Sequence, residues 1–204
     1  MAPNPNLKFE KGLWPTYPFI AGLDEAGRGA LAGPVCVGAV ILPNDNSHLS
    51  STLNGVRDSK LLTPIKRDAL TPRIKATALT WSVAFASAKE IDTLGIVPAT
   101  RLAAMRAIEL LTLFPDYLLT DFRLEVPELD IPQTAIVKGD QKSLSIAAAS
   151  ILAKTARDEV MRGLESQYPN YGLGKHKGYG TQAHRQALKS IGFSSIHRKT
   201  FRVK

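Results

Sequence analysis

Two adjacent carboxylates followed by a glycine-rich turn are the residues best suited to chemistry in this chain. Asp24 and Glu25 end an apolar run, and Gly27-Arg28-Gly29 follows one residue later. Carboxylate oxygens suit hard divalent cations, an arginine offers a donor fork to phosphate, and glycines let another molecule's backbone come close. A metal, a phosphate and a close approach together indicate phosphodiester chemistry.

Two further aspartates stand where a metal-dependent nuclease would need them. Asp121 ends an apolar segment that begins at Tyr117, and Asp140 follows another that ends at Lys138. Two-metal hydrolysis needs several carboxylates that converge on cations roughly 4 Å apart, and strand ends hold side chains on rigid backbone. Taken alone, both aspartates could be turn residues, and Asp140 could cap a helix.

A second segment, residues 171–181, interleaves lysines, glycines and tyrosines as a nucleic-acid contact surface does. Tyr179 has a glycine on each side, which favours an exposed loop over a buried tyrosine with a bonded hydroxyl. His176, His184 and His197 fit no common zinc spacing, so we expect them to be surface or phosphate-adjacent residues.

Bulk properties narrow the class of protein. The chain has 204 residues, enough for one domain, and its net charge of +8 fits a polyanionic partner. Cys36 is the only cysteine, which excludes an intrachain disulfide and a cysteine zinc cluster. The N-terminus lacks a signal-peptide pattern, and the apolar run 31–42 is shorter than the roughly 20 residues that span a membrane. We expect a cytoplasmic protein with no membrane partner.

The elements that must position the acids alternate between strand and helix patterns. Residues 1–16 carry three prolines and no clear period, so we expect a loose or edge-lying arm. Thr63 and Pro64 resemble a helix start, and Pro72 should kink or break that helix. Strands mixed with helices in one domain indicate an α/β or α+β fold. The patterns predict strands over 17–23, 35–42, 81–85, 116–120 and 134–138, and helices over 63–76, 87–90, 98–113 and 143–167.

The stretch from Phe19 to Val35 resembles the signature of bacterial ribonuclease HII, and the similarity recurs from about residue 18 to 202. The resemblance implies an RNase H-like α/β fold, a mixed sheet flanked by helices. It also implies one catalytic domain over 17–204, whose part 168–204 is a small helical appendage that contacts substrate. The implied ligands of Mg²⁺ or Mn²⁺ are the four acids Asp24, Glu25, Asp121 and Asp140. The family usually has glycine after the third acid, where this chain has Phe122.

The resemblance also implies a set of substrate contacts. The glycine-rich turn would read the 2′-hydroxyl that separates RNA from DNA, and Tyr179 would pack on the sugar after the ribonucleotide. From the residues alone, the turn could be only a tight turn, and Lys154 only a solvated lysine. The implied substrate-binding residues are Gly27, Arg28, Gly29, Ser59, Lys60, Ser150, Lys154 and Tyr179.

Three functions compete on this sequence. The resemblance favours an endonuclease that cuts the RNA strand of RNA–DNA hybrids and nicks duplex DNA 5′ to embedded ribonucleotides, leaving a 3′-hydroxyl and a 5′-phosphate. A monomer is the default expectation. The alternative is a non-catalytic basic nucleic-acid-binding protein, which leaves four strand-end acids unexplained because carboxylates repel phosphate. A dinucleotide-binding loop fails, since Ala32 stands where its third glycine is needed.

Overall fold

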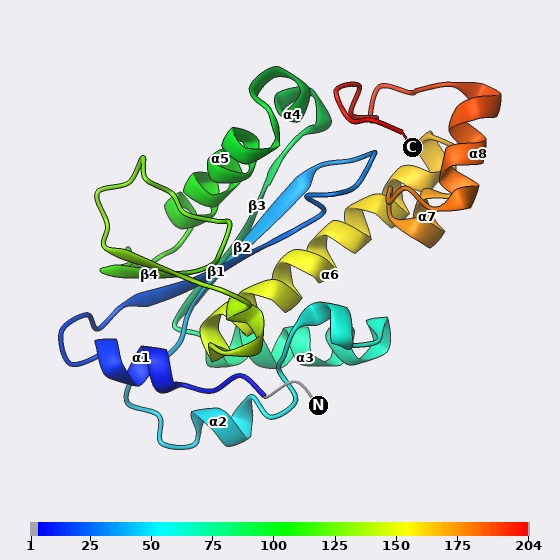
Figure 1. The fold of residues 1–204 in the computed structure, drawn as a ribbon. Coiled ribbons are helices and arrows are strands. Elements are labelled where there is room, and N and C mark those ends of the chain that lie inside the picture. The colour runs from blue at the N-terminus through cyan, green and yellow to red at the C-terminus, as the bar shows by residue number, and fades with distance from the viewer. Residues whose placement is uncertain (1–3, 204) are drawn as a thin grey trace.

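The computed structural model describes residues 4–203 and contains a five-stranded mixed sheet between helices (Figure 1). The strand order is β3-β2-β1-β4-β5. β1 pairs antiparallel with β2, which pairs antiparallel with β3, whereas β1, β4 and β5 run parallel. The mixed sheet confirms the predicted fold class. Its strands are β1 (Ile20–Ala26), β2 (Val35–Ile41), β3 (Thr80–Ala86), β4 (Tyr117–Asp121) and β5 (Gln133–Ile136).

Helices cover both faces of this sheet and bury a separate apolar core on each (Figure 1). α4 (Ala88–Leu94) and α5 (Ile96–Glu109) lie on one face. α3 (Pro64–Thr77) and the long α6 (Leu144–Gln167) lie on the other. The remaining elements are α1 (Lys8–Leu13), α2 (Leu49–Thr52), α7 (Leu173–His176), α8 (Gln182–Ile191) and the 3₁₀ turns η1 (Ser59–Leu61) and η2 (Gly139–Gln141). α7 and α8 pack at the far end of α6 as the expected helical appendage (Figure 1).

The first half of α6 lies directly on the sheet because two strand residues have no side chain. A Cβ on Gly22 would fall 2.3 Å from the backbone carbon of Ser145, and one on Gly38 would fall 2.5 Å from the carbonyl oxygen of Ala149. Alanines on the helix side keep the same short spacing. This approach carries the middle of α6 past the end of β1, where Asp24 lies.

The structure corrects the expected loose arm over residues 1–16 and the expected break at Pro72. Residues 8–13 form α1 and Asn6 bridges to Ser143, so the described part of the arm is not loose, and residues 1–3 lie outside the described residues. α3 begins after the expected cap at Thr63 and continues through Pro72 to Thr77, so Pro72 does not break it. Pro72 removes only one backbone donor, and the packing of the apolar side of α3 on α6 holds the helix together.

The side chain of Glu10 anchors α1 to the positive end of α6. Its Oε1 accepts hydrogen bonds from Ser143 Oγ (2.6 Å), Ser145 N (3.0 Å) and Ser145 Oγ (2.8 Å). Glu10→Ala should therefore lower the free energy of unfolding by about 2–4 kcal/mol. Urea unfolding measures this loss, and Glu109→Ala, which changes an exposed glutamate, is the matched control. Equal losses in the two variants would contradict the anchor.

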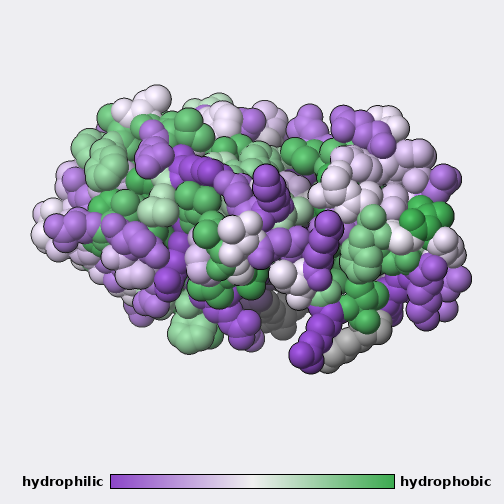
Figure 2. Space-filling view, turned by 90° about the horizontal axis from the view of Figure 1, so that it is seen from above, coloured by the Kyte–Doolittle hydropathy of each residue, from purple (hydrophilic) through white to green (hydrophobic). Residues whose placement is uncertain are grey.

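The surface seen from above carries hydrophilic residues scattered among hydrophobic ones, without a single apolar band (Figure 2). Between residues 4 and 203, no helix combines the length and apolar character needed to cross a membrane.

Candidate active site

The four predicted acids come from the neighbouring carboxyl ends of three parallel strands. Asp24 and Glu25 lie near the end of strand β1, Asp121 ends β4, and Asp140 lies in η2, which closely follows β5. Parallel neighbours end at the same edge of a sheet, so these side chains gather there. The backbone N–H of Gly139 donates to Asp121 Oδ1 (2.8 Å), which fixes the η2 turn against the end of β4.

Burial and mutual repulsion raise the pKa values of Asp24, Glu25 and Asp140. Asp24 is 2% exposed, and its burial, followed by the charge of Glu25, raises its pKa well above the ordinary range. Burial likewise raises the pKa of Glu25. Burial and then the charge of Asp58 raise the pKa of Asp140 to about 7. The charge of Asp121 adds to all three rises, so the four acids share one negative field.

The site has unused acceptors that fit a cation. Asp24 Oδ2 and Glu25 Oε2 are buried and have no hydrogen-bond partner among the described residues. In that same part of the chain, no three acidic, histidine or cysteine side chains already converge closely enough to form a metal site. Free carboxylate oxygens in a field of like charge are the donor set that a hard divalent cation binds. The four acids therefore fit one as ligands that would close around it.

A hollow of about 450 Å³ lies beside the acids and gathers almost all of the predicted substrate residues. Ser150 is the exception, since it is buried below the hollow and donates to Ser59 Oγ (2.9 Å). The side chains and backbone of the lining come from β1 and the glycine-rich loop after it, from η1, α3 and α6, and from the loop before α8. The lining is Glu25, Ala26, Gly27, Arg28, Gly29, Ser59, Lys60, Arg67, Lys154 and Tyr179.

Lys60 supplies positive charge at this edge. Burial lowers the pKa of its ammonium, but the fields of Asp24 and Asp58, followed by those of the other acids, outweigh burial and raise the pKa overall. The lysine is therefore charged throughout the physiological range and balances part of the negative field.

Tyr179 lies against two cations at the other side of the hollow. Its ring centre is 5.4 Å from Lys154 Nζ and 5.3 Å from the Arg157 guanidinium carbon. Arg157 itself is fully buried and donates to the carbonyls of Ala32 (3.1 Å), Pro34 (2.8 Å) and Lys177 (2.9 Å). The Arg157 side chain thus joins the glycine-rich loop to the loop that carries Tyr179.

The side chain of Arg28 is not free to reach phosphate in this structure. Its Nη1 donates to the carbonyl of Arg123 (3.1 Å) and lies 3.9 Å from Glu25 Oε1. The guanidinium therefore holds the turn after Asp121 against the glycine-rich loop.

Sequence reasoning missed Asp58, which is buried next to the acids. It accepts hydrogen bonds from Lys60 N (2.9 Å) and Gln141 Nε2 (3.2 Å), which links η1 to η2. Its position directly before Ser59 and Lys60 was the available signal. It also missed Arg67, which lines the same hollow and forms an ion pair with Asp158 (3.2 Å).

The expectation of surface histidines is wrong. His176, His184 and His197 are buried together in the appendage, where His176 stacks on His184 and His184 contacts His197. His184 Nδ1 lies 3.1 Å from the Tyr179 carbonyl, and its Nε2 lies 3.0 Å from His197 Nε2. His197 Nδ1 then accepts from the N–H of Ser194 (3.0 Å). A ring that must both donate and accept is neutral, so the cluster supports the Tyr179 loop without charge.

Acid should loosen this histidine cluster. Burial, followed by the field of His184, lowers the pKa of His197 to about 4, and the ring is 1% exposed. The unfolded ring titrates near 6.5, so the stability it contributes is present above pH 6.5 and is lost as pH falls toward 4. We expect a loss of about 2–3 kcal/mol.

Urea unfolding at pH 7 and pH 4.5 measures this pH dependence. His197→Gln should be less stable than the wild type at pH 7 but should lose less on acidification. His48→Asn, which changes an exposed histidine, should behave as the wild type does. Equal acid losses in the wild type and His197→Gln would contradict the neutral cluster.

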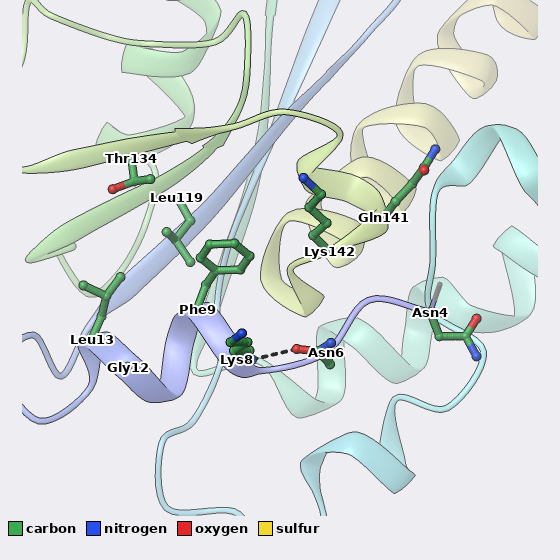
Figure 3. A pocket seen from close by; sticks show the side chains of 10 residues that line it. All are labelled: Asn4, Asn6, Lys8, Phe9, Gly12, Leu13, Leu119, Thr134, Gln141 and Lys142. Atoms are coloured by element: carbon green, nitrogen blue, oxygen red, sulfur yellow. Dashed lines mark hydrogen bonds between the residues drawn. The ribbon is translucent and has the colours of Figure 1, made fainter. Parts of the chain in front are cut away.

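A larger hollow of about 630 Å³ lies elsewhere, between α1, β4, β5 and η2 (Figure 3). Its apolar wall comes mainly from Phe9, Leu13 and Leu119, and no carboxylate lines it (Figure 3). Without acids it offers a divalent cation only neutral oxygen ligands, so the edge that carries Asp24 is the better candidate for chemistry.

Comparison with known sequences gives one consistent family. A family model described as ribonuclease HII matches residues 21–204. A ribonuclease HII of Dehalococcoides mccartyi is 49% identical over 203 residues, which cover 97% of this chain and 92% of that protein. A ribonuclease HII of Desulfitobacterium hafniense is 50% identical over 196 residues, which cover 96% of this chain and 73% of that protein.

Solved structures give the same fold. Ribonuclease H2 from Pyrococcus horikoshii superposes with a TM-score of 0.74 at 26% identity, over 91% of this chain and 94% of that one. RNase HII from Archaeoglobus fulgidus, solved in complex with PCNA, superposes with a TM-score of 0.75 at 26% identity. The match covers 91% of this chain and 96% of that one. Bst-RNase HIII, solved with Mn²⁺, is similar in fold alone, with a TM-score of 0.61 at 19% identity. The match covers 85% of this chain and 63% of that one.

Proposed function

We propose that this chain, which belongs to the ribonuclease HII family and is a ribonuclease H hydrolase, cuts the RNA strand of RNA–DNA hybrids. It would also nick duplex DNA 5′ to embedded ribonucleotides. The products would carry a 3′-hydroxyl and a 5′-phosphate. The observation that carries this proposal is the shared field of four carboxylates beside a hollow with a basic, glycine-rich rim.

Asp24, Glu25, Asp121 and Asp140 would hold two Mg²⁺ or Mn²⁺ ions. Bound divalent cations supply an ionised water at neutral pH and stabilise charge on the leaving oxygen. The unused oxygens of Asp24 and Glu25 and the raised pKa values support this role, because a bound cation stabilises such a group of charges. Mn²⁺ in the structure of Bst-RNase HIII agrees with the choice of metals.

The rest of the site would recognise and orient the nucleic acid. The backbone of Gly27, Arg28 and Gly29 would approach the ribose and test for its 2′-hydroxyl. Tyr179 would pack on the next sugar, held at its angle by Lys154 and Arg157. Lys60 and Ser59 would bind the phosphate, with Ser150 fixing the Ser59 hydroxyl.

The proposed unit of activity is a single chain. Residues 17–204 would form one catalytic domain, with 168–204 as the part that contacts substrate. α1 would support the N-terminus of α6 through Glu10. Arg157 supports this division of labour, since it joins the appendage to the glycine-rich loop.

Product mapping tests the proposal. A labelled RNA–DNA hybrid should be cut in the RNA strand with Mg²⁺ or Mn²⁺, and ligation without prior phosphate transfer should reseal the ends. Tight binding without cleavage in either metal would instead favour the non-catalytic nucleic-acid-binding protein. That alternative rests on the net charge of +8 and leaves the buried acids without a role.

A further inference from the structure

Two exposed apolar side chains stand at the rim of the carboxylate site. Phe122 directly follows Asp121 and is 54% exposed, and Val137 directly follows Ile136 and is 52% exposed. β4 and β5 are parallel partners in which Asp121 pairs with Ile136. The two side chains therefore leave the sheet from adjacent points, about one strand spacing apart.

This rim is firmly held. Arg28 Nη1 donates to the carbonyl of Arg123 (3.1 Å), and the N–H of Gly139 donates to Asp121 Oδ1 (2.8 Å). A Cβ on Gly139 would lie only 3.4 Å from the Cα of Asp121, so the two turns are in contact. The apolar pair is thus fixed relative to a proposed metal ligand, although neither member belongs to an apolar core of the described chain.

Basic residues surround the pair. Arg123 follows Phe122 and Lys138 follows Val137, and both are exposed, as is the nearby Lys142. None of the three makes an ion pair within residues 4–203. An apolar step between unpaired cations matches a duplex edge, where sugars and bases offer apolar faces between phosphates.

We propose that Phe122 and Val137 form an apolar step that packs against the nucleic-acid duplex on the side of the acids away from Tyr179. This inference rests on the proposed function. Tyr179 lies in the hollow formed by β1, η1, α3 and α6, whereas the step lies beyond β1 at the ends of β4 and β5. The duplex would be held on both sides of the scissile bond. Phe122, where the family usually has glycine, gives this chain a contact of its own.

Phe122→Ala tests the step. Loss of a ring contact to nucleic acid should raise KM about tenfold and leave kcat within a factor of two. Phe114→Ala is the matched control, because Phe114 is 62% exposed and lies just before β4, at the opposite end of the same strand. KM should be unchanged in that variant.

Shortening the duplex locates the contact. Wild type and Phe122→Ala should become equal once one arm of the duplex is trimmed and should stay different when the other arm is trimmed. Equal KM values on the full duplex would overturn the proposal, as expected if a protein partner or a second copy covers the step. A fall in kcat at constant KM would also overturn it, because Phe122 would then act through Asp121.

Two further readouts keep the outcome decisive. If Phe122→Ala fails to fold, Val137→Ser replaces it, and an unchanged KM there would overturn the step. A wild-type protein that cuts no substrate would contradict the proposed function instead. In that case, the affinity for the duplex is measured in the presence of chelator. Weaker binding by Phe122→Ala than by Phe114→Ala would support the step, and equal binding would contradict it.

Discussion

Asp24→Asn should abolish cleavage while leaving the protein folded and more stable in the absence of metal. Asp24 contributes an oxygen with no other partner and sits at the centre of the shared field. Losing its charge should slow the chemical step by about 10³-fold or more, which corresponds to roughly 4 kcal/mol of barrier. Single-turnover cleavage of an RNA–DNA hybrid measures this loss.

The stability change in Asp24→Asn has a definite sign. Burial raises the pKa of Asp24 in the folded state, so the unfolded chain ionises more easily and folding at pH 7 works against that charge. A neutral amide of the same shape should raise the free energy of unfolding by about 1–2 kcal/mol without metal. Adding Mg²⁺ or Mn²⁺ should stabilise the wild type more than the variant.

Asp130→Asn is the matched control, since it neutralises an exposed aspartate outside the site. It should change neither cleavage nor stability appreciably. Full turnover in a well-folded Asp24→Asn protein would contradict the proposed role of the acids. A hybrid affinity that falls together with turnover would show that Asp24 acts in binding rather than in chemistry.

Gly27→Ala and Gly29→Ala should separate folding of the glycine-rich loop from contact with substrate. Gly27 has φ of +89°, and a Cβ there would fall 1.8 Å from Arg157 Nε. Gly27→Ala should therefore displace the buried guanidinium, lower the free energy of unfolding by about 3–5 kcal/mol and remove activity. Thermal unfolding and cleavage assays measure the two losses.

Gly29 is free of both constraints. It is exposed, its φ is not positive, and no atom lies within 4 Å of an added Cβ. Gly29→Ala should keep its stability within about 0.5 kcal/mol. If substrate backbone approaches the loop closely, its KM should rise about tenfold or more. A stable Gly29→Ala protein with unchanged KM would contradict that approach. A Gly29→Ala protein as unstable as Gly27→Ala would contradict the described geometry of the loop.

The strands and the acid edge could be predicted because they depend on local pattern. β3 alternates in burial as its residues do, and α4 begins at Ala88 after a capping box at Ser87, close to the expected helix start at 87. Asp121 and Asp140 each follow an apolar segment, so strand ends were a sound expectation. The pairing of β1 with β4 and of β4 with β5 brings these ends together, and no local pattern specifies it.

What could not be predicted depends on partners far apart in the chain. Glu10 is buried against the hydroxyls of two serines that lie 133 and 135 residues away in the chain. No local pattern around α1 predicts such partners, so this segment was expected to be a loose arm. Asp58 meets Gln141 across 83 residues. The histidines looked solvated because the residues that bury them come from three separate segments of the appendage.

Arg28 lies in the predicted place, but its side chain has a partner that the sequence did not predict. Its position beside Glu25 made a phosphate contact the natural expectation, and it does line the hollow. In the fold its guanidinium is used by the carbonyl of Arg123, a neighbour only because β4 lies next to β1. The proposed contact of this loop with substrate therefore depends on its backbone rather than on the Arg28 guanidinium.

Cleavage of a labelled DNA duplex with one embedded ribonucleotide tests the central claim most directly. The duplex is incubated with Mg²⁺, with Mn²⁺ and with chelator, beside an all-DNA duplex of the same sequence. We predict a single nick on the 5′ side of the ribonucleotide, which requires metal and is absent from the all-DNA duplex. Binding without any cut in either metal would contradict the claim that Asp24, Glu25, Asp121 and Asp140 form a working nuclease site.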